Sequence, residues 1–404
     1  MMIPFEEALK LVLDHSGEPE AAEVSIDGAV GHVLASDVHS DIDMPPFNRS
    51  AMDGFAISGD DLRHELLEEV TAGDAREIRV KPGIACPIMT GAILPEGADR
   101  IVIVEESVVE NSILHLERVP PEGANICWKG EDIKKGQLVL EHGTRLSQQH
   151  IGIAAMAGRG VLPVYRKPRV AVVTTGTEII PPTWIPSPGQ VRNANLPLII
   201  SQLSMSDFPV EVSVHSADDP DSLRASFGQF LSCSDILIVA GGVSKGTKDF
   251  VPSVLESLGV KLHFRMVAQK PGKPLTFGSS TAGNPVFGLP GNPVSVMVSI
   301  EEYVLPLLRK RSGFKGYHKR TYHGEITSDY RKKPGRLHFL RVIAYREGNV
   351  WRLHHPDSSG SGDLMSTVNV NALAIVDSEQ LDIQAGQTLP FHFFSSTAGE
   401  LSFS

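Results

Sequence analysis

Side chains that could bind an anion and a hard metal ion are concentrated in one stretch of the sequence, from Ile236 to Pro293. The stretch reads ILIVAGGVSKGTKDF, later QKPGKPLTF, and then PVFGLPGNP. Lysine ammonium groups pair with oxyanions, and carboxylates bind cations such as Mg²⁺. The residues with this potential are Ser244, Lys245, Lys248, Asp249, Lys270 and Lys273.

Three short apolar runs are expected to position these side chains: residues 236–240, 275–277 and 286–289. Each run ends at or beside a turn rich in glycine or proline, and helical patterns begin at Asp249 and near Asn292. Apolar runs bounded by such turns are typical of buried strands. Strands that alternate with helices indicate a parallel α/β sheet, which binds ligands at the carboxyl ends of its strands.

The segment from Gly242 to Gly246 has the G-x-S-x-G pattern of a hydrolase nucleophile elbow, with Ser244 as the nucleophile. In that motif a helix begins directly at the nucleophile, but here the apolar helical pattern resumes only near Phe250. We therefore favour a different interpretation, in which a Gly-rich turn presents backbone N–H groups and hydroxyls to an anion.

The segment Lys270-Pro271-Gly272-Lys273-Pro274 holds two ammonium groups on a stiff turn, because the prolines fix φ and the glycine permits a tight bend. Such a pair suits a phosphate or another oxyanion. A lysine pair on a solvated surface is an equally good explanation of the spacing alone.

Two carboxylates are candidates for a Mg²⁺ site. Glu178 follows the expected strand 169–174, and Asp249 follows the strand 236–240, so both would lie at neighbouring strand ends. Mg²⁺ keeps several waters and needs few protein ligands when a substrate phosphate is present. Capping of a helix is the alternative role for each of them. Asp53, directly before Gly54, has the pattern of a structural turn.

Bulk properties exclude several functional classes. The chain has 404 residues and a formal net charge of −11, which argues against a surface dedicated to nucleic acid or anionic membrane. No apolar run approaches the roughly 18 residues of a membrane span, and no signal peptide is recognisable. Three widely spaced cysteines, without a C-x-x-C pair, predict buried reduced thiols in a cytoplasmic protein.

The hydrophobic pattern predicts a mixed set of elements along the chain. Residues 26–37 are expected to form a strand or turn and then a short helix, and Arg309, Lys310 and Arg311 a solvated helix end. The other expected helices span residues 4–15, 148–157, 195–205, 220–231 and 293–311. The other expected strands span residues 77–80, 100–105, 113–118, 169–174, 210–215, 321–326, 337–345, 350–353, 372–376 and 388–394.

This order of elements predicts a multidomain α/β protein with a central doubly wound α/β domain. Residues 1–40 and 133–166 are expected to form a discontinuous helical domain, into which a β-rich module, residues 41–132, is inserted. The α/β domain is expected at residues 167–313 and a C-terminal, barrel-like β domain at residues 314–404.

Seven motifs in order resemble the molybdopterin molybdotransferase family, whose members insert molybdenum in molybdenum-cofactor biosynthesis. The resemblance covers nearly the whole chain, and the last two motifs together with GGVSKG are highly specific. The motifs are PPFNRSAMDGFA (45–56), MTGAILPEGAD (89–99), NICWKGEDIKKG (125–136), KPRVAVVTTGTEI (167–179), DILIVAGGVSKGTKDF (235–250), KPGKPLTFG (270–278) and GLPGNPVS (288–295).

The resemblance implies a homodimer whose active cleft lies where the α/β domain of one chain meets the inserted module of the other. It implies a reaction of adenylylated molybdopterin with molybdate and Mg²⁺, in which the dithiolene sulfurs take up molybdenum and AMP leaves. Other proteins of molybdenum-cofactor biosynthesis are expected partners, whereas nucleic acid and membranes are not.

The resemblance also assigns residues. Those expected to act in catalysis are Asp53, Thr90, Asp132, Glu178, Asp249 and Lys273, of which Glu178 and Asp249 would support Mg²⁺. Those expected to bind the pterin substrate or the oxyanion are Gly241, Gly242, Ser244, Lys270, Pro290, Asn292, Pro293, Arg341 and Ser361.

Two positions depart from the family pattern. Thr177 and Thr247 stand where the family usually has aspartate, and both changes remove carboxylates from the expected metal site. Because Glu178 and Asp249 remain, we expect Mg²⁺ binding to persist but to weaken. Replacement of Asp249 by asparagine is then expected to abolish AMP release that depends on molybdate and Mg²⁺.

Two other functions are compatible with related folds. Some relatives act as scaffolds that cluster membrane receptors, but the lysines and carboxylates retained here argue against a decayed site. A molybdopterin adenylyltransferase would need only the α/β domain, so the additional modules favour metal insertion. Molybdate and tungstate, both tetrahedral dianions of similar size, are not distinguished by the sequence.

Overall fold

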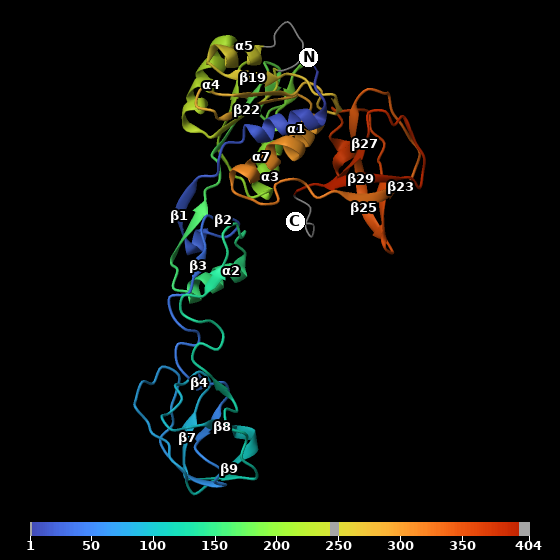
Figure 1. The fold of residues 1–404 in the computed structure, drawn as a ribbon. Coiled ribbons are helices and arrows are strands. Elements are labelled where there is room, and N and C mark those ends of the chain that lie inside the picture. The colour runs from blue at the N-terminus through green and yellow to red at the C-terminus, as the bar shows by residue number, and fades with distance from the viewer. Residues whose placement is uncertain (1, 243–249, 396–404) are drawn as a thin grey trace. The chain divides into compact units, whose positions relative to one another are not determined.

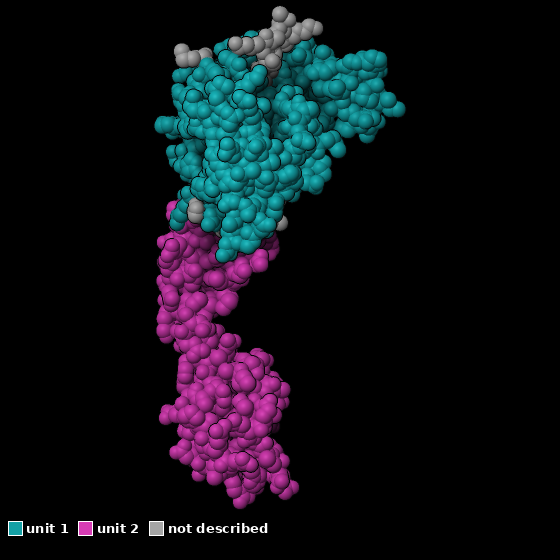
Figure 2. All heavy atoms as spheres, turned by 90° about the vertical axis from the view of Figure 1, so that its right-hand side faces the viewer, with its two compact units in different colours: residues 1–23, 31–35, 163–404 teal, residues 24–30, 36–162 magenta. Residues whose placement is uncertain are grey.

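The computed structural model describes residues 2–242 and 250–395, and the chain folds into two compact units (Figure 1, Figure 2). Unit 1 comprises Met1–Glu23, Gly31–Ala35 and Pro163–Ser404, and unit 2 comprises Val24–Val30 and Ser36–Leu162. The expected division into four domains stays a prediction. Of the two helices expected in a common helical domain, the first belongs to unit 1 and the second to unit 2.

A six-stranded sheet is the centre of the α/β part of unit 1. Its order is β17 (Val210–Ser216), β14 (Val170–Thr175), β18 (Ile236–Ala240), β22 (Pro285–Leu289), β21 (Thr276–Ser279) and β19 (Lys261–Phe264). The first four strands are parallel, as predicted, but β21 pairs antiparallel with both β22 and β19. The start of β21 therefore lies at the same edge as the end of β22, which brings the Lys270–Pro274 turn to the carboxyl edge of the parallel strands.

Helices cover both faces of this sheet, so the central strands β14, β18 and β22 are buried on both sides. Val170 and Val172 of β14 pack into one apolar cluster, and Ala171 and Val173 pack into another. The helices on the first face are α1 (Phe5–Asp14), α3 (Asn195–Met205), α6 (Pro293–Ser299) and α7 (Leu305–Arg311), and those on the second are α4 (Pro220–Cys233) and α5 (Phe250–Ser257). A π-helical segment, η3 (Ile300–Val304), connects α6 to α7.

A closed five-stranded barrel follows in unit 1, which confirms the expected C-terminal β fold. Its strands pair in the order β25 (Leu337–Glu347), β26 (Val350–His354), β23 (Tyr322–Ile326), β29 (Thr388–Phe393) and β27 (Ala372–Val376), and β27 pairs back to β25. Strand β20 (Gln269–Lys270) adds to β25, with Lys270 opposite His338, so the lysine turn and the barrel share a sheet. Shorter barrel elements are β24 (Tyr330–Arg331), β28 (Asp382–Ile383) and η4 (Met365–Thr367).

Unit 2 is mostly β structure around a second six-stranded sheet. Its order is β8 (Arg100–Ile103), β5 (Gly54–Ile57), β7 (Ile84–Ile88), β6 (Arg63–Leu66), β10 (Ile113–Leu116) and β9 (Ser107–Glu110). Its other elements are η1 (Ile26–Gly28), β3 (Val38–His39), β4 (Arg49–Ser50), η2 (Val104–Glu106), β11 (Ile126–Cys127), β12 (Leu138–Leu140) and α2 (Gln148–Met156). Among the described residues, β1 (Ala21–Ser25) pairs with β13 (Val161–Tyr165), which pairs with β2 (Val33–Leu34), and β15 (Ile179–Ile180) pairs with β16 (Val191–Arg192).

Three local predictions are wrong. Residues 26–37 form η1, a turn and β2 rather than a short helix, because Gly31 adopts φ 81° there. Residues 77–80 form no strand and make only the isolated bridge Arg79–Glu96. The end of α7 is not solvated, since Arg309 is 3% exposed and donates to the Ser395 hydroxyl at 2.9 Å.

All three cysteines are free thiols, as predicted, but only Cys86 is buried, whereas Cys127 is half-buried and Cys233 is exposed. In the part of the chain that the structure describes, no helix combines the length and the apolar character needed to cross a membrane.

Candidate functional site

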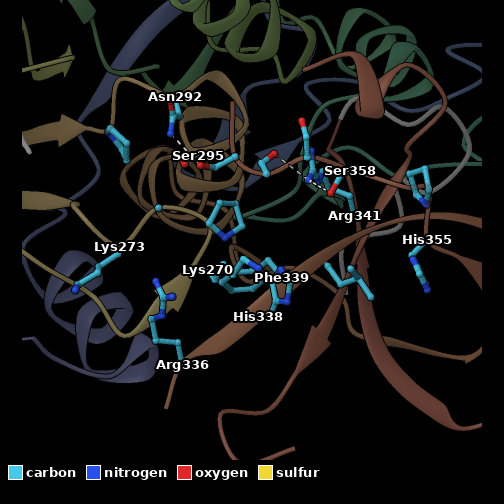
Figure 3. A pocket seen from close by; sticks show the side chains of 18 of the residues that line it. Lys270, Lys273, Asn292, Ser295, Arg336, His338, Phe339, Arg341, His355 and Ser358 are labelled. Atoms are coloured by element: carbon cyan, nitrogen blue, oxygen red, sulfur yellow. Dashed lines mark hydrogen bonds between the residues drawn. The ribbon is translucent and has the colours of Figure 1, made fainter. Parts of the chain in front are cut away.

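Two adjoining pockets of unit 1 meet at the turn between β22 and α6. The main pocket, of about 720 Å³, lies between the lysine turn, this second turn and the barrel. The strand-end pocket, of about 560 Å³, lies over the carboxyl ends of β14 and β18. Four residues line both pockets: Pro274, Pro290, Gly291 and Asn292. Figure 3 shows the main pocket with residues of all three walls around it.

A buried glutamine, Gln269, stabilises the lysine turn, residues 270–274, by a hydrogen bond to its backbone. The amide of Gln269, which is 0% exposed, donates to the carbonyl of Pro271 at 3.1 Å and accepts from the Tyr303 hydroxyl of η3. Gly272 adopts φ 88°, and a Cβ there would lie 2.8 Å from the Gln269 amide nitrogen. The turn is therefore rigid, and Lys270 and Lys273 line the main pocket from it.

The barrel wall of the main pocket is organised by Arg341 on β25. Its guanidinium donates to the hydroxyls of Ser358 at 2.7 Å and Ser366 at 2.6 Å, and to the carbonyls of Asp363 at 3.0 Å and Gly360 at 3.2 Å. The turn of residues 358–362, rich in serine and glycine, thus folds around this one arginine. Its Ser361 hydroxyl accepts from the Asn292 amide at 2.9 Å, which connects the barrel to the start of α6.

Positive charge dominates the main pocket. Partial burial, and then the cations Arg336, Arg341 and Lys333, lower the pKa of Lys270. Burial, together with Lys270 and the other nearby cations, lowers the pKa of His338 to about 3, so this imidazole is neutral at pH 7. The Tyr330 hydroxyl lies 2.8 Å from His338 Nδ1, and burial raises the pKa of this phenol. Four cations, Lys270, Lys273, Arg336 and Arg341, line this pocket with one carboxylate, Asp357, so an entering anion would meet an excess of positive charge.

The strand-end pocket combines close backbone approaches with hydroxyl and carboxylate oxygens. Gly241 adopts φ 106°, and a Cβ there would lie 2.4 Å from the Thr175 carbonyl oxygen, so only glycine fits. The Thr175 hydroxyl donates to Asp218 at 3.2 Å. The Asn193 amide donates to the Thr174 hydroxyl at 2.9 Å, and Glu178 lines the same pocket with an exposed side chain.

The donor set of this pocket fits Mg²⁺ bound together with a substrate phosphate. Glu178 and Asp218 supply carboxylate oxygens, and Mg²⁺ requires only one or two carboxylates when waters and phosphate complete its shell. Among the described residues, no group of three or more His, Cys, Asp or Glu side chains is placed to hold a metal alone. Asp249 and Ser244, the other predicted metal and anion ligands, lie outside the described residues.

The structure brings together ten of the sequence-predicted site residues in these two pockets of unit 1. They are Glu178, Gly241, Gly242, Lys270, Lys273, Pro290, Asn292, Pro293, Arg341 and Ser361. Pro293 lies at the first position of α6 and lines the strand-end pocket.

Three other predicted residues lie in unit 2. The Asp53 carboxylate accepts hydrogen bonds from the backbone N–H and the hydroxyl of Thr90, both at 2.7 Å, and these bonds lower its pKa. Asp132 lies in a separate small pocket with Met44 and Arg49.

The pocket residues that were not identified from the sequence include Asn193, Asp218, Arg336 and His338. The order of elements could have indicated Asp218. This residue follows the strand β17, which is parallel to β14, so it lies at the same sheet edge as Thr175. No such signal existed for Arg336 or His338, whose position depends on the pairing of β20 with β25.

Family models match most of the chain. A model described as "MoeA N-terminal region (domain I and II)" matches residues 3–158. One described as "Probable molybdopterin binding domain" matches residues 171–310, and one described as "MoeA C-terminal region (domain IV)" matches residues 323–394. The two pockets lie within the second and third matches.

Individual proteins are similar over nearly the full length. A molybdopterin molybdenumtransferase of Synechococcus elongatus is 35% identical over 403 residues, covering 96% of this chain and 98% of the relative. One of Haemophilus influenzae is 31% identical, covering 98% and 100%. A crystal structure of a molybdopterin biosynthesis MoeA protein from Pyrococcus horikoshii has a TM-score of 0.81 at 28% identity, covering 98% of this chain and 99% of that one.

Proposed function

We propose that this chain, which belongs to the molybdopterin molybdenumtransferase family, transfers molybdenum from molybdate into adenylylated molybdopterin and releases AMP. The observation that carries this proposal is the joining of a cation-rich pocket to a pocket of backbone and oxygen ligands at the turn around Asn292. The reaction brings an oxyanion and a phosphate-bearing pterin together, so it needs both kinds of pocket side by side.

In the main pocket, Lys270, Lys273 and Arg341 are proposed to hold molybdate and the charge of the dithiolene. Charge-assisted hydrogen bonds to oxyanions are about twice as strong as neutral ones. Because Gln269 and Gly272 fix the lysine turn before a ligand arrives, little reorganisation is required on binding. Arg341 and Asn292 keep the Ser361 turn in place, so that the opposite wall is equally preorganised.

In the strand-end pocket, the pterin-linked phosphate is proposed to lie against Gly241 and Gly242, at the end of β18, and against Thr175 and Gly176, at the end of β14. Glu178 and Asp218 would hold Mg²⁺ there, and Asp249 is a further candidate ligand from the sequence. When bound, Mg²⁺ would neutralise the charge that develops on the departing AMP phosphate. Positions 177 and 247, both threonine, supply no carboxylate, so we expect the protein to need more Mg²⁺ for half-maximal activity than relatives with aspartate.

A homodimer is part of the proposal. Asp53 and Thr90, hydrogen-bonded to each other and exposed, are proposed to complete the cleft of a second chain, and Asp132 to support that surface. A cytoplasmic location, with other cofactor-biosynthesis proteins as partners, is consistent with the three free thiols.

The test is incubation of the full chain with adenylylated molybdopterin, Mg²⁺ and either molybdate or tungstate, followed by measurement of AMP and protein-bound metal. Native protein is expected to release AMP only when the oxyanion and Mg²⁺ are both present. Lys273→Gln is expected to lower the rate at least tenfold, whereas Lys261→Gln, an exposed lysine on β19 outside both pockets, is expected to leave it unchanged.

Two outcomes would refute the proposal. A protein that binds neither the oxyanion nor the pterin would be a scaffold of the same fold. A protein that joins an adenylyl group to molybdopterin but takes up no metal would be an adenylyltransferase.

A further inference from the structure

A smaller pocket, of about 260 Å³, adjoins the main pocket on the barrel and is lined only by basic side chains. We call it the cation pocket. Its lining residues are Lys270, Arg331, Lys332, Lys333, Arg336 and His338. Lys270, Arg336 and His338 also line the main pocket, so the two pockets share a wall. Arg331, Lys332 and Lys333 line only the smaller one.

The loop that carries these cations is fixed by its own buried lysine. The Lys332 ammonium donates to the carbonyls of Arg336 at 3.1 Å and Ser378 at 2.9 Å, and the residue is only 9% exposed. The backbone N–H groups of Lys332 and Gly335 donate to the carbonyls of Leu381 and Ser378 at 2.8 and 3.2 Å. Gly335 adopts φ 86°, which lets the chain turn back sharply toward β25. The cations are therefore presented by an ordered loop rather than by a solvated tail.

Nearby carboxylates compensate only part of this charge. Arg331 pairs with Asp382 at 3.0 Å, and Asp377 and Glu379 act on Lys332. None of these three acids lines the pocket. Lys270, Lys333 and Arg336 therefore line a common space without a carboxylate among the lining residues. Burial, and after it the neighbouring cations, lower the pKa of Lys270.

We propose that the cation pocket binds a tetrahedral dianion, either an inorganic oxyanion or the phosphate of a nucleotide. Five cations line the space, and three carboxylates outside it interact with Arg331 and Lys332, which leaves an excess of two positive charges for such a ligand. Pockets for drug-sized molecules have volumes of roughly 300 to 1,000 Å³, so this one is suited to a single small group. Because Lys270 and Arg336 face both pockets, an anion held here would lie beside the ligand of the main pocket.

The test is calorimetric titration of the full chain at low ionic strength, where charge interactions are least screened, with molybdate and AMP as separate probes. Lys333→Glu places a carboxylate at a position that lines only the cation pocket. Lys261→Glu is the matched control, because it reverses the charge of an exposed lysine on β19 that lines neither pocket. Both side chains are exposed, and the unfolding midpoint of each variant would verify that its fold is intact.

Native protein and Lys261→Glu are expected to show two binding events for at least one of the probes. In Lys333→Glu one of these events is expected to weaken at least tenfold. If the weakened event is a molybdate event, the cation pocket binds an inorganic oxyanion. If it is an AMP event, the pocket binds a nucleotide phosphate. Equal binding by the two variants, or a single event in native protein for both probes, would overturn the proposal. Neither titration involves turnover, so a failure of molybdenum transfer would be a separate result.

Discussion

At the scale of single residues, the position of the two pocket lysines depends on Gln269 and Tyr303, which do not line the main pocket. Gln269 holds the turn through the Pro271 carbonyl and is itself held by Tyr303. Gly272 must be glycine because of its positive φ and the nearby amide. The sequence predicted the lysines and the need for a flexible residue between them. It could not predict Tyr303, which lies on a helix and reaches Gln269 only in the folded chain.

Gly272→Ala is expected to destabilise the protein by about 1–3 kcal/mol, because alanine would be strained at φ 88° and its Cβ would approach the Gln269 amide at 2.8 Å. The same substitution should weaken molybdate binding, since the displaced turn carries both lysines. Urea unfolding and calorimetric titration measure the two effects. Gly152→Ala, in helix α2 with no atom near the new Cβ, is the control and should not destabilise. Equal stability of the two variants would contradict this account of the turn.

The lowered pKa of Lys270 predicts how molybdate affinity changes with pH. Only the ammonium form binds an anion well, so affinity is full below this pKa and falls as pH rises through it. Because the pKa lies below the ordinary lysine value of 10.5, the fall should begin at a lower pH than for an unperturbed lysine. Lys270→Arg, which keeps its charge, should move the fall to higher pH. Identical titration profiles of molybdate affinity in the two proteins would exclude Lys270 as the titrating group.

At the scale of elements, a buried charge cluster joins the long helix of the α/β part to the barrel. Lys319 forms ion pairs with Glu301 and Glu302 of η3, and the His392 ring of β29 lies 3.1 Å from Glu302. Glu301 also accepts from the backbone and hydroxyl of Ser395 at 3.1 and 2.8 Å. These contacts fix the barrel against η3, which continues from α6, and so help to set the separation of the two walls of the main pocket.

Lys319→Met is expected to destabilise the protein by about 3–5 kcal/mol, because it leaves two buried carboxylates without their common partner. Lys315→Met, at an exposed position four residues earlier, is the control. Thermal or urea unfolding of the two variants at pH 7 makes the comparison. A loss below about 1 kcal/mol in Lys319→Met would show that the cluster contributes little.

The same cluster predicts an acid limit of stability. His392, Lys319 and Arg309 outweigh the cost of burial and lower the pKa of Glu302 below its usual 4.5. The stability from its charged form is thus complete above the pKa of the unfolded state and is lost as pH falls through the lower, folded value. Melting temperatures between pH 3 and pH 7 should fall more steeply on the acid side in native protein than in Glu302→Gln. Parallel curves would contradict the assignment.

Elements defined by local pattern were predictable, and those defined by distant pairing were not. The bounds of α3 and β18 agree with the apolar pattern of residues 195–205 and 236–240. The antiparallel direction of β21 and the addition of β20 to the barrel depend on partners far along the chain, and no local periodicity encodes them. For the same reason the buried role of Arg309 was missed, because its partner Ser395 is 86 residues away.

At the scale of the whole molecule, the predicted site residues fall in two separate units. Lys273, Arg341 and Glu178 belong to unit 1, whereas Asp53 and Thr90 belong to unit 2. The family motifs, rather than any pattern of composition or periodicity, indicated that both groups are functional. In the proposed homodimer, a cleft shared between two chains would bring the predicted residues of both units together.

Mixing two inactive variants tests this shared cleft. Asp53→Asn and Lys273→Gln chains, each inactive alone, should recover activity when they are mixed and allowed to exchange subunits. Half of the dimers would then be mixed and would hold one intact cleft each, so about a quarter of native activity is expected. Mixtures as inactive as their components, despite exchange demonstrated by mass, would place each complete site within one chain.

The most direct test of the central claim is the ratio of AMP released to molybdenum retained in a single turnover, with protein in excess over adenylylated molybdopterin. Molybdenum transfer predicts a ratio of about one, with no AMP formed when molybdate or Mg²⁺ is left out. AMP release without molybdate, or AMP release with no metal retained on the pterin, would contradict the assignment of this chain as a molybdenum-inserting enzyme.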